Sequence, residues 1–164
     1  MCLNSKDKEY KVAKEAITCY KVVMKVERDG MPALVSTIYD FLYKIGESYE
    51  INKSEYFPLK GRHFTKYGAD GKKESGYFTT LYHGFHSYKR LQDAKDNCAY
   101  DSCPLHWRNF LGEVMLKCEI PAGARYWIGN QRWSDDNYAE YCSDQIRVVA
   151  WKLRDEKTWR KNLY

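Results

Sequence analysis

Within the segment from Glu113 to Pro121, an apolar residue occupies every second position from Val114 to Ile120. Successive side chains of a β-strand point to opposite faces, so this period of two indicates a strand with one buried face. Proline cannot donate to a strand ladder and glycine permits a tight turn, so Pro121-Ala122-Gly123 ends the strand. We expect this strand to lie at the centre of a sheet. Its apolar face consists of Val114, Leu116, Cys118 and Ile120.

Other strand-like segments are spread along the chain. The run from Ile17 to Val26 is rich in residues that favour strands, and an Asp29-Gly30 turn follows it. The aromatic segment from Ser36 to Ile51 predicts either two short strands or an irregular connection. Further strands are expected at residues 77–83, 124–128, 138–143 and 145–153.

Helices are expected near residues 6–16, 88–98 and 103–111. Residues 1–16 are charged and weakly apolar, which predicts an N-terminal arm or a short helix. Ser87 is a natural N-cap, and apolar residues recur behind it at helical spacing. Strands and helices together predict an α+β fold: a single domain over residues 17–164, with a twisted mixed or mostly antiparallel sheet of about five to seven strands and a few helices.

Composition narrows the class of protein. A chain of 164 residues is the size of one domain, and its 15 Tyr and 5 Trp residues can build an aromatic core or line a groove. The charges behind the net value of +5 are interspersed, so nucleic-acid binding is unlikely, although the basic segment 157–161 keeps it as an alternative. No run approaches the roughly 18 apolar residues of a membrane span, and no signal-peptide profile is present. We therefore expect a cytoplasmic protein that does not bind membranes.

Cysteines and histidines give no metal pattern. The six cysteines are expected to be reduced thiols, because the chain shows no secretion signal. Cys98 and Cys103 lack a second pair that would complete a zinc site. His83 and His86 are expected to have structural or hydrogen-bonding roles. The sequence therefore predicts no metal.

A glycine-rich polar segment spans residues 52–76. Arg62 lies within it, with Lys60 and Lys66 nearby. Segments of this length in a compact domain are usually functional or mobile. The segment predicts either a lid over a phosphate or nucleotide site or a disordered hairpin tip.

The segment from Gly84 to Arg90 is a candidate anion site. Gly84 lets the backbone approach a ligand, and the N–H groups behind the expected N-cap Ser87 would bind a phosphate or carboxylate. Lys89 and Arg90 oppose the helix dipole in the first turn, which is easier to understand if an anion binds there. An ordinary N-cap with solvated basic residues is the alternative.

Three segments together resemble a family of small proteins from bacteriophages and gut bacteria. They are Gly84-Phe85-His86-Ser87-Tyr88, Lys117-Cys118-Glu119-Ile120-Pro121-Ala122-Gly123-Ala124 and Glu140-Tyr141-Cys142-Ser143-Asp144-Gln145-Ile146. The resemblance covers most of residues 1–150 and carries no established activity. It implies a phage-type accessory protein, which would lie in the cytoplasm of the host cell.

A more distant resemblance is to the ADP-ribosyltransferase fold, in which an early strand carries His or Arg, a middle strand Tyr or Ser, and a late strand Glu. Tyr20-Lys21, Phe85-His86-Ser87 and Glu140-Tyr141 follow that order, with Lys21 in the place of His or Arg. The resemblance implies that Glu140 is catalytic. It would hold the ribose hydroxyl and stabilise the oxocarbenium-like state as nicotinamide leaves, with NAD as the cofactor.

These observations predict a functional surface where Lys21, His86 and Glu140 line one cleft. The first hypothesis is a non-catalytic protein that binds a nucleotide-like anionic small molecule or a host defence protein, with no cofactor. The alternative is an ADP-ribosyltransferase or NAD-cleaving enzyme, and the second alternative is a nucleic-acid-binding protein. The expected ligand-binding residues are Tyr20, Lys21, Arg62, Gly84, Phe85, His86, Ser87, Tyr88, Arg90 and Tyr141.

Overall fold

Strands dominate the computed structural model. It describes residues 3–5, 7, 9–36, 41–51, 60–67, 73–81, 84–96, 110–129 and 139–163. Within these residues the only helix, α1 (Leu91–Asp96), has six residues, and every strand pair is antiparallel. The predicted α+β class with a few helices is therefore wrong, because the fold is β-rich.

The larger of two sheets has ten strands, more than the five to seven that the sequence predicts. Eight of them follow one another in the order β2 (Lys11–Val12), β11 (Arg125–Gly129), β12 (Glu140–Ser143), β9 (Phe85–Tyr88), β3 (Ile17–Arg28), β10 (Phe110–Ile120), β13 (Gln145–Leu153) and β6 (Ser48–Glu50). The other two are β4 (Met31–Ser36), which pairs with β3, and β5 (Leu42–Tyr43), which pairs with β4.

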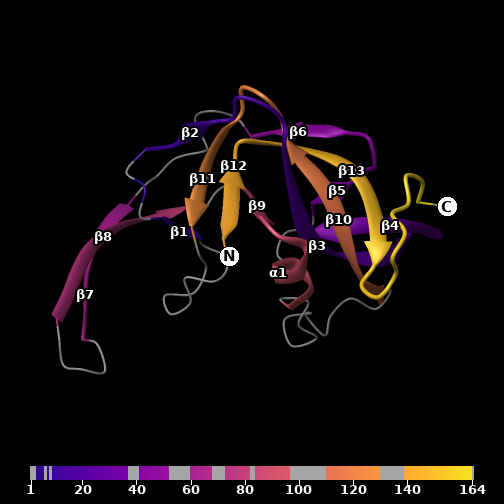
Figure 1. Cartoon of the computed structure of the whole chain (residues 1–164). Helices are drawn as coiled ribbons and strands as arrows, with labels where there is room; N and C mark the ends of the chain where they lie inside the picture. The colour runs from indigo at the N-terminus through magenta and orange to yellow at the C-terminus, as the bar shows by residue number, and fades with distance from the viewer. Residues whose placement is uncertain are drawn as a thin grey trace.

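The smaller sheet has three strands, in the order β1 (Leu3–Ser5), β8 (Lys73–Leu81) and β7 (Lys60–Tyr67). Figure 1 shows β7 and β8 extending away from the larger sheet as a two-stranded ribbon. The helix α1 packs against β3 and β9 of the larger sheet. The ribbon therefore stands apart from the region where the middle strands meet.

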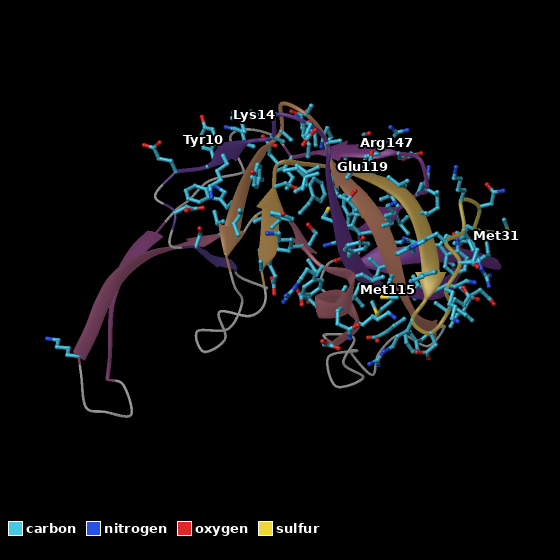
Figure 2. All side chains as sticks on the ribbon, viewed as in Figure 1. Tyr10, Lys14, Met31, Met115, Glu119 and Arg147 are labelled. Atoms are coloured by element: carbon cyan, nitrogen blue, oxygen red, sulfur yellow. The ribbon has the colours of Figure 1, made fainter. Side chains whose placement is uncertain are left out.

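The centre of the larger sheet is the pair β3 and β10. Their register runs from Ile17 beside Ile120 to Val26 beside Phe110. The other edge of β10 pairs with β13, which places Met115 beside Lys152 and Glu119 beside Arg147; Figure 2 labels Met115, Glu119 and Arg147. The two strands predicted most directly from the pattern, at 17–26 and 113–121, are confirmed, and the second is central as expected.

The free edge of β3 is divided between two strands. β9 pairs with β3 only where Tyr88 lies beside Tyr20. From Val23 to Arg28 the same edge pairs with β4. β9 therefore separates from β3 just past Tyr20, and polar side chains gather at this point.

The larger sheet has two faces, which we call the Cys19 face and the Tyr20 face after adjacent residues of β3. The main buried apolar cluster lies on the Cys19 face and includes Cys19, Leu116 and Trp151. Smaller clusters lie on the Tyr20 face, one around Met24 and one that joins Leu81, Trp127 and Cys142. Because side chains alternate along a strand, odd and even positions of β3 belong to different environments.

Residues 154–163, which we call the tail, turn back along β13. The Trp151 N–H donates to Arg160 O at 2.9 Å, and the Arg160 N–H donates to Trp151 O at 2.8 Å. The Trp151 indole N–H donates to Asn162 O at 2.7 Å. Leu163 packs against the cluster on the Cys19 face. The tail is thus held to the edge of β13 by backbone and side-chain contacts.

The expected helices are mostly absent from the described residues. Within residues 6–16 the described part contains the strand β2. The helix expected at 88–98 is shorter, since α1 begins at Leu91 and Ser87 belongs to β9. Of residues 103–111, positions 103–109 lie outside the described residues, and Phe110 and Leu111 begin β10. The β-strand ladder overrides the N-cap signal at Ser87, because β9 is fixed by pairing with β12.

Of the two remaining segments, residues 36–51 follow the pattern, whereas residues 52–76, with the composition of a loop, contain strands. Ser36 to Ile51 contains the two short strands β5 and β6. Residues 52–76 contain β7 and the start of β8, and the rest of that segment lies outside the described residues. Among the helical residues that the structure describes, no helix is long and apolar enough to cross a bilayer.

The burial of β10 gives a direct test of the fold. Replacing Leu116, which is 0% exposed, by Ala is expected to lower the free energy of unfolding by about 3 kcal/mol, because it removes buried methyl groups and leaves a cavity. Leu111→Ala on the same strand, at 53% exposed, is the matched control and should change it by less than about 0.5 kcal/mol. Urea unfolding measures both values. Equal losses in the two variants would contradict the assignment of the core.

Candidate functional site

Three segments that are distant in sequence lie side by side in the larger sheet. In register, Glu140 of β12 is the neighbour of Tyr88 of β9, and Tyr88 is the neighbour of Tyr20 of β3. Two rows further along, Cys142 lies beside His86. The strands that carry the expected site residues are therefore adjacent, and we call this region the β3–β9–β12 junction.

The expected site residues are nevertheless divided between the two faces of the sheet. Phe85 and Tyr141 belong to the apolar cluster of the Cys19 face, and by alternation Lys21 and Ser87 start on that side. Tyr20, His86, Tyr88 and Glu140 have the opposite parity and lie on the Tyr20 face. The three residues expected to line one cleft, Lys21, His86 and Glu140, thus have neighbouring backbones but do not all project from the same face.

Lys21 reaches across the junction to the backbone of β9. Its Nζ donates to His86 O at 2.6 Å and lies 5.7 Å from the centre of the Tyr43 ring. Because β9 pairs with β3 only at Tyr20, the amine supplies a donor where the ladder stops. Burial of the amine lowers the pKa of Lys21, and the surrounding thiols and Glu140 oppose that shift.

Three thiols lie near this amine: Cys19, Cys118 and Cys142 form no disulfide and are 0% exposed. Cys19 and Cys118 are register neighbours on β3 and β10. Burial raises the pKa of Cys19 to about 11 and that of Cys118 well above its usual value. The Cys19 and Cys118 thiols are therefore protonated at neutral pH and are poor nucleophiles. They act as small apolar side chains in the core.

His86 is held in its neutral form. Its Nε2 lies 3.8 Å from Cys142 Sγ. Burial, and next the nearby Lys21, lower the pKa of His86 from 6.5 to about 3. Its Nδ1 atom is buried without a hydrogen-bond partner, and so is the Ser87 hydroxyl on the other face. A neutral imidazole can accept one hydrogen bond and donate another, but it brings no positive charge to a ligand.

Glu140 is buried at 3% exposure within β12. It lies beside Tyr88, and its charge is close enough to Lys21 to oppose the lowering of the lysine pKa. It forms one row with Tyr88 and Tyr20 across three adjacent strands. Its burial, however, leaves little of the carboxyl group open to a substrate.

The other expected site residues lie away from the row. Arg62 belongs to β7 of the smaller sheet, where its register neighbour is Phe78. Gly84 precedes β9 with a φ of 144°, a conformation that favours glycine. Arg90 donates through Nε to Asp93 Oδ2 at 2.8 Å, so its place in the first turn is explained by a carboxylate of α1. The N-cap expected at Ser87 is wrong, because Ser87 belongs to β9 and α1 begins at Leu91, whereas anion binding by this segment stays a prediction.

A second group of side chains was not predicted. The rings of Tyr20 and Trp159 are stacked, with centroids 6.1 Å apart and an angle of 28° between their planes. Lys152 Nζ lies 4.9 Å from the centre of the Trp159 ring and donates to Glu156 O at 2.9 Å. We call Tyr20, Lys95, Lys152 and Trp159 the tail platform.

The two lysines of the tail platform interact with each other. Burial lowers the pKa of Lys152, and the next largest cause is the positive charge of Lys95 on α1. Lys152 is buried at 3% exposure. The sequence marked residues 157–161 as basic but gave no signal that Trp159 returns to β3.

Trp127 is another residue that sequence reasoning missed. It is the register neighbour of Cys142 on β11, so it shares the Tyr20 face with His86. Its indole Nε1 is buried and has no hydrogen-bond partner. From the sequence, Trp127 is only one residue of the short strand expected at 124–128.

Among the described residues, no group of three or more His, Cys, Asp and Glu side chains could hold a metal ion.

Comparisons of the chain with protein-family models, curated proteins and solved structures found no match. The assignment of function therefore rests on the geometry described above.

The neutral state of His86 makes stability depend on pH. An unfolded chain protonates this histidine near pH 6.5, whereas the folded chain does so only near pH 3, so stability is lost as the pH falls between these values. Between pH 7 and pH 4 the wild type should lose up to about 3 kcal/mol more than His86→Phe. Urea unfolding at the two pH values measures the difference. Equal losses in both proteins would show that His86 is not held neutral.

Proposed function

We propose that the chain is a non-catalytic binding protein that captures a nucleotide-like anionic ligand on the tail platform. The observation that carries this proposal is the stacked pair of Tyr20 and Trp159 beside two lysines that repel each other. A base can stack on the aromatic rings, and a phosphate can pair with the positive charges beside them.

The aromatic pair supports recognition of a base. Both residues are partly exposed, so each ring keeps accessible surface. Tyr20 is fixed in the central strand between Lys117 of β10 and Tyr88 of β9. Stacking of one base on an aromatic side chain is worth about 1–3 kcal/mol and does not depend on the identity of the base. The tail platform would therefore accept a range of nucleotides.

The lysine pair supports recognition of the anionic group. Lys95 lowers the pKa of Lys152 because two positive charges disfavour each other. A phosphate bound near both amines would replace this repulsion with two attractive interactions. Binding should therefore weaken as salt concentration rises, because salt screens the attraction between the amines and an anion.

The junction favours binding over catalysis. Its Cys19 and Cys118 thiols are protonated, its histidine is neutral, and Glu140 is buried. None of these groups is set up as a nucleophile or as a proton acceptor open to a substrate. Capture of a ligand without chemical change is the function that this arrangement supports best.

ADP-ribosyl transfer or NAD cleavage is the second candidate. The in-register row of Tyr20, Tyr88 and Glu140 favours it, because it places a carboxyl group beside two aromatic rings on adjacent strands. Incubation with NAD and cell lysate, followed by mass spectrometry, tests this candidate. Glu140→Gln should abolish any product. Equal product from wild type and variant would remove Glu140 from the reaction.

Calorimetry tests the proposed binding. NAD, ADP-ribose and cyclic nucleotides are titrated into the wild type, and at least one should bind. Trp159→Leu should weaken that ligand by about 5-fold to 150-fold, because it removes one stacking partner. Lys152→Gln should also weaken it, by removing a charge near the phosphate. Lys161→Gln, which removes an exposed charge from the same tail, is the matched control and should bind like the wild type.

Two results would contradict the proposal. One is that no ligand of the panel binds to the wild type. The other is that Trp159→Leu and Lys152→Gln bind as tightly as Lys161→Gln. Circular dichroism of each variant establishes that the fold is retained before the affinities are compared.

A further inference from the structure

Two buried nitrogen atoms on the Tyr20 face lack hydrogen-bond partners. They are Nε1 of Trp127, a residue only 1% exposed, and Nδ1 of His86. Buried polar groups are almost always paired with protein or water, and each exception calls for an explanation. The two residues lie on β11 and β9, on either side of β12, so a single partner that bridges β12 would serve both atoms.

The strand register places these two residues on either side of Cys142. Trp127 of β11 lies beside Cys142 of β12, and Cys142 lies beside His86 of β9. Two strand spacings separate the backbones of Trp127 and His86, about 10 Å in all. An amide edge with one hydrogen bond of about 2.9 Å at each side is comparable in length with this span.

The chemistry of the two atoms defines the partner. An indole N–H can only donate, so Trp127 requires an acceptor such as a carbonyl oxygen. His86 is neutral and has its Nε2 next to the Cys142 thiol. With the proton on Nε2, its Nδ1 is an acceptor and requires an N–H donor. A carbonyl oxygen beside an N–H meets both requirements.

We propose that Trp127 and His86 form a site for a small uncharged molecule with an amide-type edge, a carbonyl oxygen next to an N–H, as in a pyrimidine base or a carboxamide. The carbonyl oxygen accepts from Trp127 Nε1, and the ligand N–H donates to His86 Nδ1. Neither protein group carries a charge, so an uncharged ligand suits the site. The site shares no residue with the tail platform and does not depend on it.

Cys142 and Leu81 form the apolar side of this site. Both pack with Trp127 in one buried cluster. A planar heteroaromatic ring would contact this apolar surface while its polar edge meets the two nitrogen atoms. A molecule with the same edge but no ring, such as a simple amide, should therefore bind more weakly.

Nuclear magnetic resonance tests the site through the signal of Trp127. The indole N–H resonances of the ¹⁵N-labelled protein are assigned by triple-resonance experiments, and uracil and nicotinamide are titrated as probes. Both should shift the Trp127 indole resonance selectively. The matched control is 1,3-dimethyluracil, which keeps both carbonyl oxygens but has no N–H, and it should bind at least about ten-fold more weakly than uracil.

Two variants separate the roles of the residues. Trp127→Phe removes the donor and keeps an apolar ring, and His86→Phe removes the acceptor while retaining the Trp127 signal. Each should weaken uracil by about ten-fold or more. His86→Phe keeps the test valid even if Trp127→Phe does not fold.

The proposal is overturned if no probe shifts the Trp127 resonance selectively, which would mean that water alone satisfies these atoms. It is also overturned if dimethyluracil binds as tightly as uracil, or if His86→Phe leaves the affinity unchanged. Binding of nucleotides to the tail platform is measured separately, through Trp159 and Lys152, so either site can fail without the other.

Discussion

The pairing of β3 with β10 is the interaction on which the rest of the molecule depends. The twelve residues of β3 are long enough to pair with β10 along one edge and with two different strands along the other. Since β4 occupies the edge from Val23 onward, β9 is forced away beyond Tyr20. The place where the two strands part is the place where Lys21 replaces a missing backbone donor. The polar character of the junction is thus a result of strand competition for one edge.

Alternation along β3 then assigns different tasks to adjacent residues. Cys19 and Lys21 face a core in which thiols are protonated and the amine is enclosed. Tyr20 faces the helix, the tail and the smaller clusters. One face therefore provides stability, and the other gathers the aromatic rings, lysines and unpaired nitrogen atoms that a ligand can use.

The sequence predicts part of this arrangement. Strands at 17–26 and 113–121 follow from residue pattern alone, because local alternation and the final burial agree. The helix after Ser87 was overestimated because an N-cap signal is local, whereas pairing with β12 is a tertiary interaction. The sequence correctly indicates that the segments of the site are neighbours. It does not show that Lys21 and His86 start on opposite faces of the sheet. The sequence could not assign Trp159 and Trp127 to the site, because their neighbours depend on how the tail and β11 fold back.

The tail also affects how copies of this chain associate in solution. An unpaired strand edge invites another chain to add to the sheet, and natural proteins block such edges. Along β13, Val148 exchanges backbone hydrogen bonds with Gly46 and Glu47, and Trp151 does so with Arg160. These few contacts occupy donors and acceptors that a second molecule would need. The tail, which carries Trp159 of the tail platform, therefore also blocks aggregation through this edge of the sheet.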